Sequence, residues 1–222
     1  MKDYIIQNIT KERHKWETWF LKKHYAKRVP ALVECFGLYD NITLIGVCSF
    51  SVLPRMLMEC ACFETMKLNG FELSRLVISE KHEKNILSHF VSMALNEMKI
   101  KYAPCFIVSY ADSNMNHYGY IYQSTNWIYT GITNERNKYT NKATGKDIHE
   151  RHIRDKNKIE LDGVIKTKQL GKYRYFYFLG SSRECKRMKK DFRYPILKYP
   201  KGENKRYDSS YEPKTYTLFG DE

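Results

Sequence analysis

Apolar and polar residues recur along the chain with two periods, which predicts alternating strands and helices. Strand-like apolar runs occupy residues 32–39, 42–53, 71–79, 105–110, 127–132 and 173–179. Apolar residues from Ile86 to Met98 recur at steps of four and one, which places them on one face of an amphipathic helix. Other helices are predicted over 11–23, with Thr10 as the cap, and over 116–124. This order predicts an α/β fold with a single mixed central sheet flanked by helices.

The hydrophobic pattern weakens after residue 135, where basic residues become frequent. We therefore expect one domain over 1–182 that contains a basic insertion at about 136–170. Within that insertion, 147–158 is predicted as a charged helix. Residues 183–222 are rich in Lys, Tyr and Pro, and we expect a C-terminal extension that wraps the domain or binds a partner.

The positive charge of the chain is concentrated in its C-terminal half. The formal net charge is +13, and residues 136–206 hold 22 Lys and Arg against 8 Asp and Glu, so the rest of the chain is almost neutral. Tyr and Phe residues are interleaved with these basic residues. Basic groups bind phosphates through counterion release and aromatic rings stack on unpaired bases, so this region favours a nucleic-acid partner. The alternative is a solvated surface whose tyrosines pack inward.

Several protein classes are excluded by the sequence. The longest weakly polar run is too short to span a bilayer, and the N-terminus lacks the apolar segment of a signal peptide, so we expect a cytoplasmic protein without membrane contact. The six Cys lack paired metal spacing and are predicted to be buried thiols of a reduced compartment. His149 and His152 are three residues apart, which favours a solvated helix over a zinc site.

Two strand–helix units contain candidate chemistry. The helix predicted to begin near residue 85 follows a strand, and a helix N-terminus in that position is a general anion site, although the connecting loop 79–85 has no Gly and also fits an ordinary connection. Asp112 ends the strand at 105–110, and Tyr122 lies on the next helix. The two form a plausible acid/base pair, while periodicity alone places Tyr122 in the core.

Two further positions combine residue types that suggest binding. His24 and Tyr25 lie in a loop and are candidates to ligate a metal, bind a base or cap the preceding helix. Arg75 interrupts an apolar strand, so its guanidinium needs either an acidic partner within the protein or a bound anion.

Six segments together resemble the Mom family of phage DNA-modification proteins. They are HYAKRVP (24–30), FGLY (36–39), ELSRLV (72–77), SYAD (109–112), HYGYIYQSTNWIYTG (117–131) and YPK (199–201). The resemblance covers roughly residues 20–205, and the long block at 109–131 is its most specific part. It implies a fold similar to the GNAT acetyltransferases (acyl-CoA N-acyltransferases). It also implies conversion of the exocyclic amine of adenine in DNA to a carbamoylmethyl (acetamido-type) adenine, which protects DNA from restriction endonucleases.

The resemblance also implies roles for individual residues. The implied catalytic residues are His24, Tyr25, Arg75, Asp112 and Tyr122, with Tyr122 as the acid for a leaving thiolate and Arg75 as the holder of an anionic group. The implied donor is of the acyl-CoA type, and its candidate contacts are Leu76, Val77, Ile78, Lys84, Asn85 and Asn114. Iron is a further candidate cofactor, with His24, Tyr25, Asp112 and Tyr122 as its ligands. The absence of a Gly-rich turn at 79–85 argues against ordinary acetyl-CoA binding.

The implied partner is double-stranded or locally opened DNA in a bacterial host. Its candidate contacts are Lys27, Arg28, Lys172, Arg174, Lys186, Arg187, Lys189, Lys190 and Lys201. Since a paired adenine cannot reach a cleft, we expect the base to be flipped and stacked on Tyr25 or Trp127. The competing interpretations are a GNAT-type N-acyltransferase acting on RNA or protein, and a non-catalytic DNA-binding phage protein.

Overall fold

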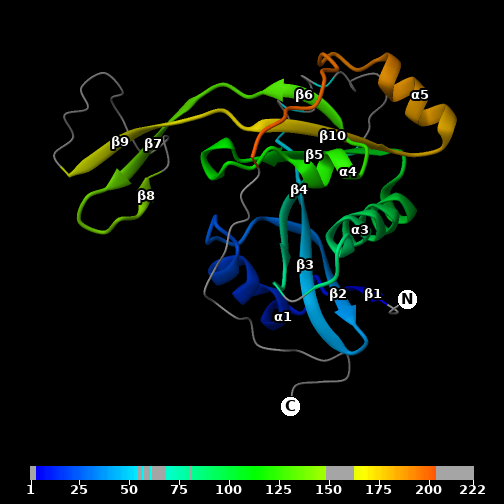
Figure 1. Cartoon of the computed structure of the whole chain (residues 1–222), viewed down its shortest axis with the longest axis horizontal. Helices are drawn as coiled ribbons and strands as arrows, with labels where there is room; N and C mark the ends of the chain where they lie inside the picture. The colour runs from blue at the N-terminus through cyan, green and yellow to red at the C-terminus, as the bar shows by residue number, and fades with distance from the viewer. Residues whose placement is uncertain are drawn as a thin grey trace.

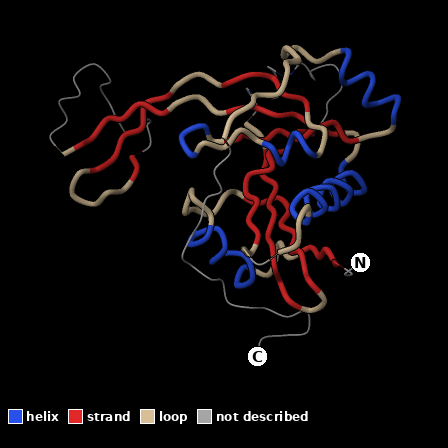
Figure 2. The backbone as a smooth tube through the Cα atoms, in the orientation of Figure 1, coloured by secondary structure: helices blue, strands red, loops and turns tan. Residues whose placement is uncertain are grey.

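A mixed seven-stranded sheet forms the centre of the molecule (Figures 1 and 2). The computed structural model describes residues 4–54, 57, 61, 69–80, 82–148 and 163–203. In spatial order the strands are β1 (Tyr4–Asn8), β2 (Leu32–Asp40), β3 (Thr43–Val52), β4 (Asn69–Ile78), β5 (Cys105–Ala111), β10 (Tyr173–Leu179) and β6 (Ile128–Ile132). Only β4 and β5 pair in parallel, and the predicted hairpin is confirmed as β2 and β3. The α/β prediction with one mixed central sheet is therefore correct, and only β1 among the strands of this sheet was not predicted.

Helix α1 (Arg13–Thr18) and a π-helical turn (Trp19–Lys23) cover one face of the sheet. Trp16, Trp19 and Phe20 are buried there against the strands. The predicted cap at Thr10 is wrong: Glu12 precedes the helix, and the Thr10 hydroxyl instead accepts a hydrogen bond from the backbone N–H of Cys35. Thr10 thus joins the N-terminal segment to β2.

Helices α3 (Ile86–Tyr102) and α4 (Tyr120–Ser124) lie on the opposite face. The apolar face predicted for α3 is confirmed, because its members from Ile86 to Met98 lie in the main core cluster or pack against it. Helix α4 begins later than predicted, since Asn116 (φ 53°) and Gly119 (φ 76°) are in the left-handed region. A Cβ on Gly119 would lie 2.4 Å from the Tyr175 ring, so this turn requires glycine.

The parallel pairing of β4 and β5 stops in the middle of β4. Glu72 and Val108 are the last paired residues, although β4 continues to Ile78 and β5 to Ala111. A β-bulge at Ser74 accompanies this divergence: Glu72 pairs with Ser51 of β3 and Arg75 with Ser49, so β4 contains one extra residue. Ser49 and Ser51 point to the same face of β3 because strand side chains alternate. The bulge therefore places Glu72 and Arg75 on one face, the face covered by α1.

A second, three-stranded sheet forms an arm that projects from the domain (Figure 1). It contains β7 (Arg136–Asn141), β8 (Asp147–Ile148) and β9 (Val164–Gln169), and it lies within the predicted basic insertion. The helix predicted at 147–158 is wrong at its start, where residues 147–148 form a strand. The rest of that helix, with His149 and His152, lies outside the described residues. Tyr139 is buried in β7, but most other side chains of the arm strands are exposed or half-buried. These strands therefore lack the apolar alternation of a core strand, which is why the sequence did not predict them.

The described part of the 183–222 segment lies against the domain. Helix α5 (Ser182–Lys190) begins with a capping box between Ser181 and Glu184, and it buries Met188 beside Phe106 and Phe176. The chain then crosses β6 and α4, where the Tyr199 hydroxyl donates to the Trp127 carbonyl at 2.6 Å. We call residues 191–203 the strap.

The helices and the cysteines bear on the expected absence of membrane spans and on the predicted buried thiols. Within the described ranges, no helix combines the length and apolar character needed to cross a bilayer. Cys35, Cys48 and Cys105 are buried free thiols, as predicted, and Cys185 is half-buried. Cys60 and Cys62 lie outside the described residues.

Met188→Ala tests whether α5 is part of the folded domain. The side chain is fully buried, so its truncation should lower the free energy of unfolding by about 2–4 kcal/mol. Lys189→Ala, at the neighbouring exposed position, should change it by less than about 0.5 kcal/mol. Urea unfolding followed by circular dichroism measures both, and equal small effects would mean that α5 contributes nothing to the core.

Candidate active site

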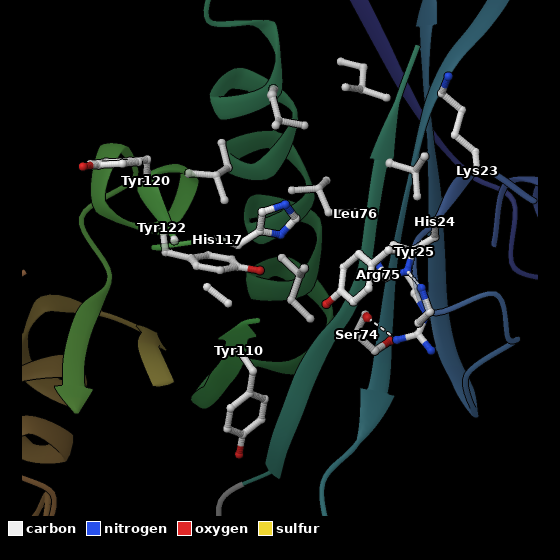
Figure 3. Close-up of a pocket in the computed structure, with 18 of the residues that line it drawn as sticks. Lys23, His24, Tyr25, Ser74, Arg75, Leu76, Tyr110, His117, Tyr120 and Tyr122 are labelled. Carbon is white, nitrogen blue, oxygen red and sulfur yellow. Dashed lines mark hydrogen bonds between the residues drawn. The ribbon is translucent and has the colours of Figure 1, made fainter. Parts of the chain in front are cut away.

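The divergence of β4 and β5 opens a cavity of about 460 Å³ that passes through the gap in the sheet. Its lining includes His24, Tyr25, Arg75 and Tyr122, four of the five predicted catalytic residues. The fifth, Asp112, is not in the lining. In Figure 3, Tyr122 on α4 and Tyr25 on the loop after the π-helical turn point toward one another from opposite walls.

Tyr122 forms one wall of the cavity and is almost fully buried, with 7% of its surface exposed. Ser109 Oγ lies 2.7 Å from its hydroxyl and 2.8 Å from the Leu73 carbonyl. Because the Ser109 hydroxyl has a single hydrogen, both contacts form together when Ser109 donates to the carbonyl and accepts from the phenol. Burial raises the pKa of Tyr122, so the phenol keeps its proton and can act as an acid.

His24 and Tyr25 are stacked, with ring centroids 4.3 Å apart. The His24 Nδ1 accepts the backbone N–H of Ala26 at 3.0 Å. Burial, with the charge of Arg75 as the next cause, lowers the pKa of His24 to about 3, so the ring is neutral at pH 7. Burial raises the pKa of Tyr25 to about 12, and its ring meets His117 edge-on at 5.7 Å.

Three carboxylates lie in or beside the cavity, and they differ in their partners. Glu80 is paired with Lys23 at 2.6 Å. Asp112 is paired with Lys172 at 2.8 Å and accepts two hydrogen bonds from Asn114, and together these outweigh burial and lower the pKa of Asp112. Such a carboxylate is a weak base.

Glu72 is the third carboxylate, and it lines the cavity directly. Burial raises its pKa despite the positive charges of Arg75 and Lys172. Within the described part of the chain, no ion pair holds it. Glu72 is not among the residues predicted from the sequence, although an acidic residue within an apolar strand is the same kind of signal as Arg75.

The predicted donor contacts divide into two groups. Leu76, Val77 and Ile78 line the cavity, whereas Lys84, Asn85 and Asn114 do not. Asn85 precedes α3 in the left-handed conformation without a side-chain cap, and the Asn114 amide is bonded to Asp112 and to the backbone of Leu170. Leu76 and Ile78 pack with the core cluster on the α3 side of β4, whereas Val77 packs with Trp16 and Trp19 on the α1 side.

The predicted DNA contacts lie in three places. Lys27, Arg28 and Lys172 are near the cavity, and Arg28 and Lys172 line it. Lys186, Arg187, Lys189 and Lys190 are exposed on α5, and Lys201 is exposed on the strap. The arm and α5 lie at opposite ends of β10 (Figure 1).

Two residues predicted to contact nucleic acid pack against other side chains of the protein instead. The Arg174 guanidinium stacks on Tyr194 at 3.8 Å and its Nε donates to Thr130, so this side chain is held within the fold. Trp127 is completely buried and lies against Tyr122, so it is unable to stack on a flipped base. Tyr25 remains as the predicted stacking residue.

The predicted iron ligands do not form a suitable donor set. His24 uses Nδ1 for the Ala26 N–H, Asp112 is occupied by Lys172 and Asn114, and both tyrosines are held in the phenol form. Across the described ranges, no group of three or more His, Cys, Asp or Glu is placed to hold a metal. The iron prediction is not supported.

Comparison with known proteins identifies the family. A model of the Mom protein family matches residues 3–201. The chain belongs to the Mom protein family. No curated protein matches this Mom-family chain.

The fold of this Mom-family chain is similar to that of solved GNAT acetyltransferases, as the resemblance implied. Arabidopsis thaliana NAA60 in complex with a bisubstrate analogue has a TM-score of 0.51 at 8% identity, covering 80% of this chain and 98% of its own. The same plant protein in complex with acetyl-CoA has a TM-score of 0.49 at 8% identity, covering 80% of this chain and 100% of its own. An N-acetyltransferase from Staphylococcus aureus Mu50 has a TM-score of 0.45 at 12% identity, with coverage of 79% and 97%. At these identities the likeness establishes the fold alone.

His24→Asn tests the neutral state of the buried imidazole. An unfolded histidine titrates near pH 6.5 and the folded one near 3, so between these values the unfolded chain binds more protons and acid favours unfolding. From pH 6.5 to pH 5, this residue should lower the free energy of unfolding by about 1.5 kcal/mol. His24→Asn keeps an acceptor for the Ala26 N–H and should remove this dependence of the free energy of unfolding on pH. The variant His89→Asn, at an exposed position, should keep the dependence. Urea unfolding at several pH values measures it, and parallel curves of unfolding free energy against pH for the wild type and both variants would contradict a neutral His24.

Proposed function

We propose that this protein is a transferase that modifies the exocyclic amine of adenine in DNA, forming a carbamoylmethyl (acetamido-type) adenine. Membership of the Mom family supports the reaction. The observation that carries the proposal is the cavity itself, in which an unpaired carboxyl at Glu72 and a protonated phenol at Tyr122 open toward a basic surface. A module that only binds DNA has no need for a desolvated acid/base pair. Restriction evasion in a phage-infected bacterial cytoplasm is the biological role that fits this chemistry.

Glu72 is the general base in this proposal. The adenine amine is a weak nucleophile that loses a proton as its new bond to carbon forms, so a nearby carboxylate accelerates the step. A carboxylate with a raised pKa is a stronger base than one held by a lysine, which favours Glu72 over Asp112. Asp112 then acts as a positioning residue, since it holds Lys172 at the cavity wall.

Tyr122 supplies a proton to the leaving group. Its hydroxyl already contacts Ser109, which can accept the phenol's hydrogen bond until a substrate replaces it. A carbamoylmethyl group is joined to nitrogen through a methylene carbon, so its formation differs from amide formation by simple acyl transfer. The N–C bond therefore forms by displacement at the methylene, and the bond between the methylene and the leaving group breaks. Glu72 takes the proton that the amine loses, and Tyr122 gives its proton to the departing group.

A small-molecule donor of the acyl-CoA type fits the α3 side of the cavity. Leu76, Ile78, Leu87 and Ile121 form an apolar wall there, and an NAA60 structure with a similar fold contains acetyl-CoA. The flipped adenine enters from the opposite face, where Tyr25 offers its ring. The arm and α5 hold the DNA backbone without reading its sequence.

The variant Glu72→Gln tests whether Glu72 is the general base, and Asp112→Asn is compared with it because Asp112 is the other candidate. After expression in a bacterium, nucleoside mass spectrometry of the host DNA should find at least about 100-fold less modified adenine with Glu72→Gln, because proton transfer is lost. Asp112→Asn should reduce the yield less. Equal affinity of all variants for DNA would confirm that the loss is chemical, and a larger defect in Asp112→Asn would return the base role to Asp112. An unmodified adenine pool with folded wild-type protein would contradict the proposed function.

The double variant Lys189→Gln/Lys190→Gln tests the α5 surface. Each lost phosphate contact should reduce the slope of log K against log salt by about one. The double variant should therefore have a slope shallower by up to about two. The control variant Lys11→Gln/Lys22→Gln removes the same number of positive charges from the nearly neutral part of the chain. It should leave the slope of log K against log salt unaltered. Fluorescence anisotropy at several salt concentrations measures this, and identical slopes in the two variants would exclude α5 as a DNA contact.

A further inference from the structure

Arg75 is a cation buried in the wall of the cavity. Only 8% of its surface is exposed, and it lines the cavity. Its Nη1 donates to the Ser74 carbonyl at 2.6 Å, and Nε and Nη2 reach the Arg28 carbonyl at 3.4 Å. Among the described residues, no carboxylate forms an ion pair with it. A buried charge in this state is costly unless an anion completes the site.

The surroundings of Arg75 add positive charge to that part of the cavity. Arg28 lines the same space, and burial together with the charge of Arg28 lowers the pKa of Arg75. Lys172 also lines the cavity, but Asp112 at 2.8 Å compensates its charge. The charge of Glu72 favours the charged form of Arg75 without forming an ion pair with it. Arg28 and Arg75 therefore make this part of the lining cationic, and it can accept an anion.

The face of the sheet on which Arg75 lies indicates whether the DNA or the small-molecule donor carries the anion. The bulge at Ser74 places Arg75 on the face covered by α1, together with Glu72, and the loop that carries Tyr25 and Arg28 lies beside it. The apolar wall suited to the donor lies on the opposite face, against α3 and α4. Arg28 is exposed and Lys172 is partly exposed, so the cationic side of the cavity continues to the molecular surface.

We propose that Arg75 binds the backbone phosphate next to the flipped adenine. This inference rests on the proposed function. A nucleotide that swings out of a duplex brings its own phosphate toward the pocket, and a planar guanidinium matches two phosphate oxygens. Arg75 would then fix the sugar–phosphate position while Tyr25 contacts the base, so that the amine lies near Glu72.

The test measures DNA binding and needs no donor. Fluorescence anisotropy is used with the full-length protein and a duplex that contains one mismatched adenine, which flips readily. The duplex has natural phosphates, or a single uncharged methylphosphonate on the 5′ side or the 3′ side of that adenine. In the wild type, one of the two methylphosphonates should weaken binding about 10-fold or more, as expected for loss of a charged hydrogen bond.

Arg75→Gln should bind the natural duplex as weakly as the wild type binds the sensitive methylphosphonate duplex, and should lose nothing further on it. Arg75→Lys should recover part of the affinity, which separates loss of charge from misfolding. Arg13→Gln, at an exposed site on α1, should behave as the wild type.

Three results would overturn the assignment. The first is a wild type that binds all three duplexes equally, and the second is an Arg75→Gln variant that stays sensitive to the methylphosphonate. The third is an Arg75→Gln variant that binds DNA normally but fails to modify it in cells, because the anion would then belong to the donor. Failure of the proposed function gives a different pattern: the wild type would bind no duplex and its host DNA would contain unmodified adenine.

Discussion

The early end of the parallel pairing between β4 and β5 governs the arrangement of the site. Beyond Glu72 and Val108 the two strands separate, and the space between them connects the two faces of the sheet. A continuous sheet would keep the α1 side and the α3 side apart. Here the gap lets groups from both sides meet: Tyr25 from the α1 side and Tyr122 from the α4 side share one cavity. Backbone geometry thus makes a two-substrate reaction possible before any side chain is considered.

Partial burial then sets the protonation state of each group. His24 is kept neutral, Tyr25 and Tyr122 keep their protons, and the Glu72 carboxyl has an increased affinity for a proton. In contrast, the Asp112 carboxylate is paired with Lys172 and hydrogen-bonded by Asn114, and both stabilise its negative charge. Glu72 within β4 and Asp112 directly after β5 therefore have opposite proton affinities, and the difference comes from their partners rather than from their residue type.

The sequence predicted the sheet, the helices α1 and α3, and four of the residues that line the cavity as catalytic candidates, because these depend on hydrophobic periodicity and on the resemblance to the Mom family. It did not predict that Glu72 and Arg75 share a face. Regular alternation places residues three apart on opposite faces of a strand, and only the bulge at Ser74 reverses this. The burial of Trp127 and the pairing of Asp112 with Lys172 were also missed, because both depend on residues distant in the sequence.

The strap has a consequence for the order in which the protein matures. Helix α4, which carries Tyr122, is only five residues long, and its Gln123 side chain is bonded to the Pro200 carbonyl, 77 positions further along the chain. Tyr120 is likewise bonded to Gly202. A helix this short is unstable alone, and its bonds to the strap form only after residues 200–202 have been synthesised. The growing chain therefore contains its basic arm before the contacts between the strap and α4 can form.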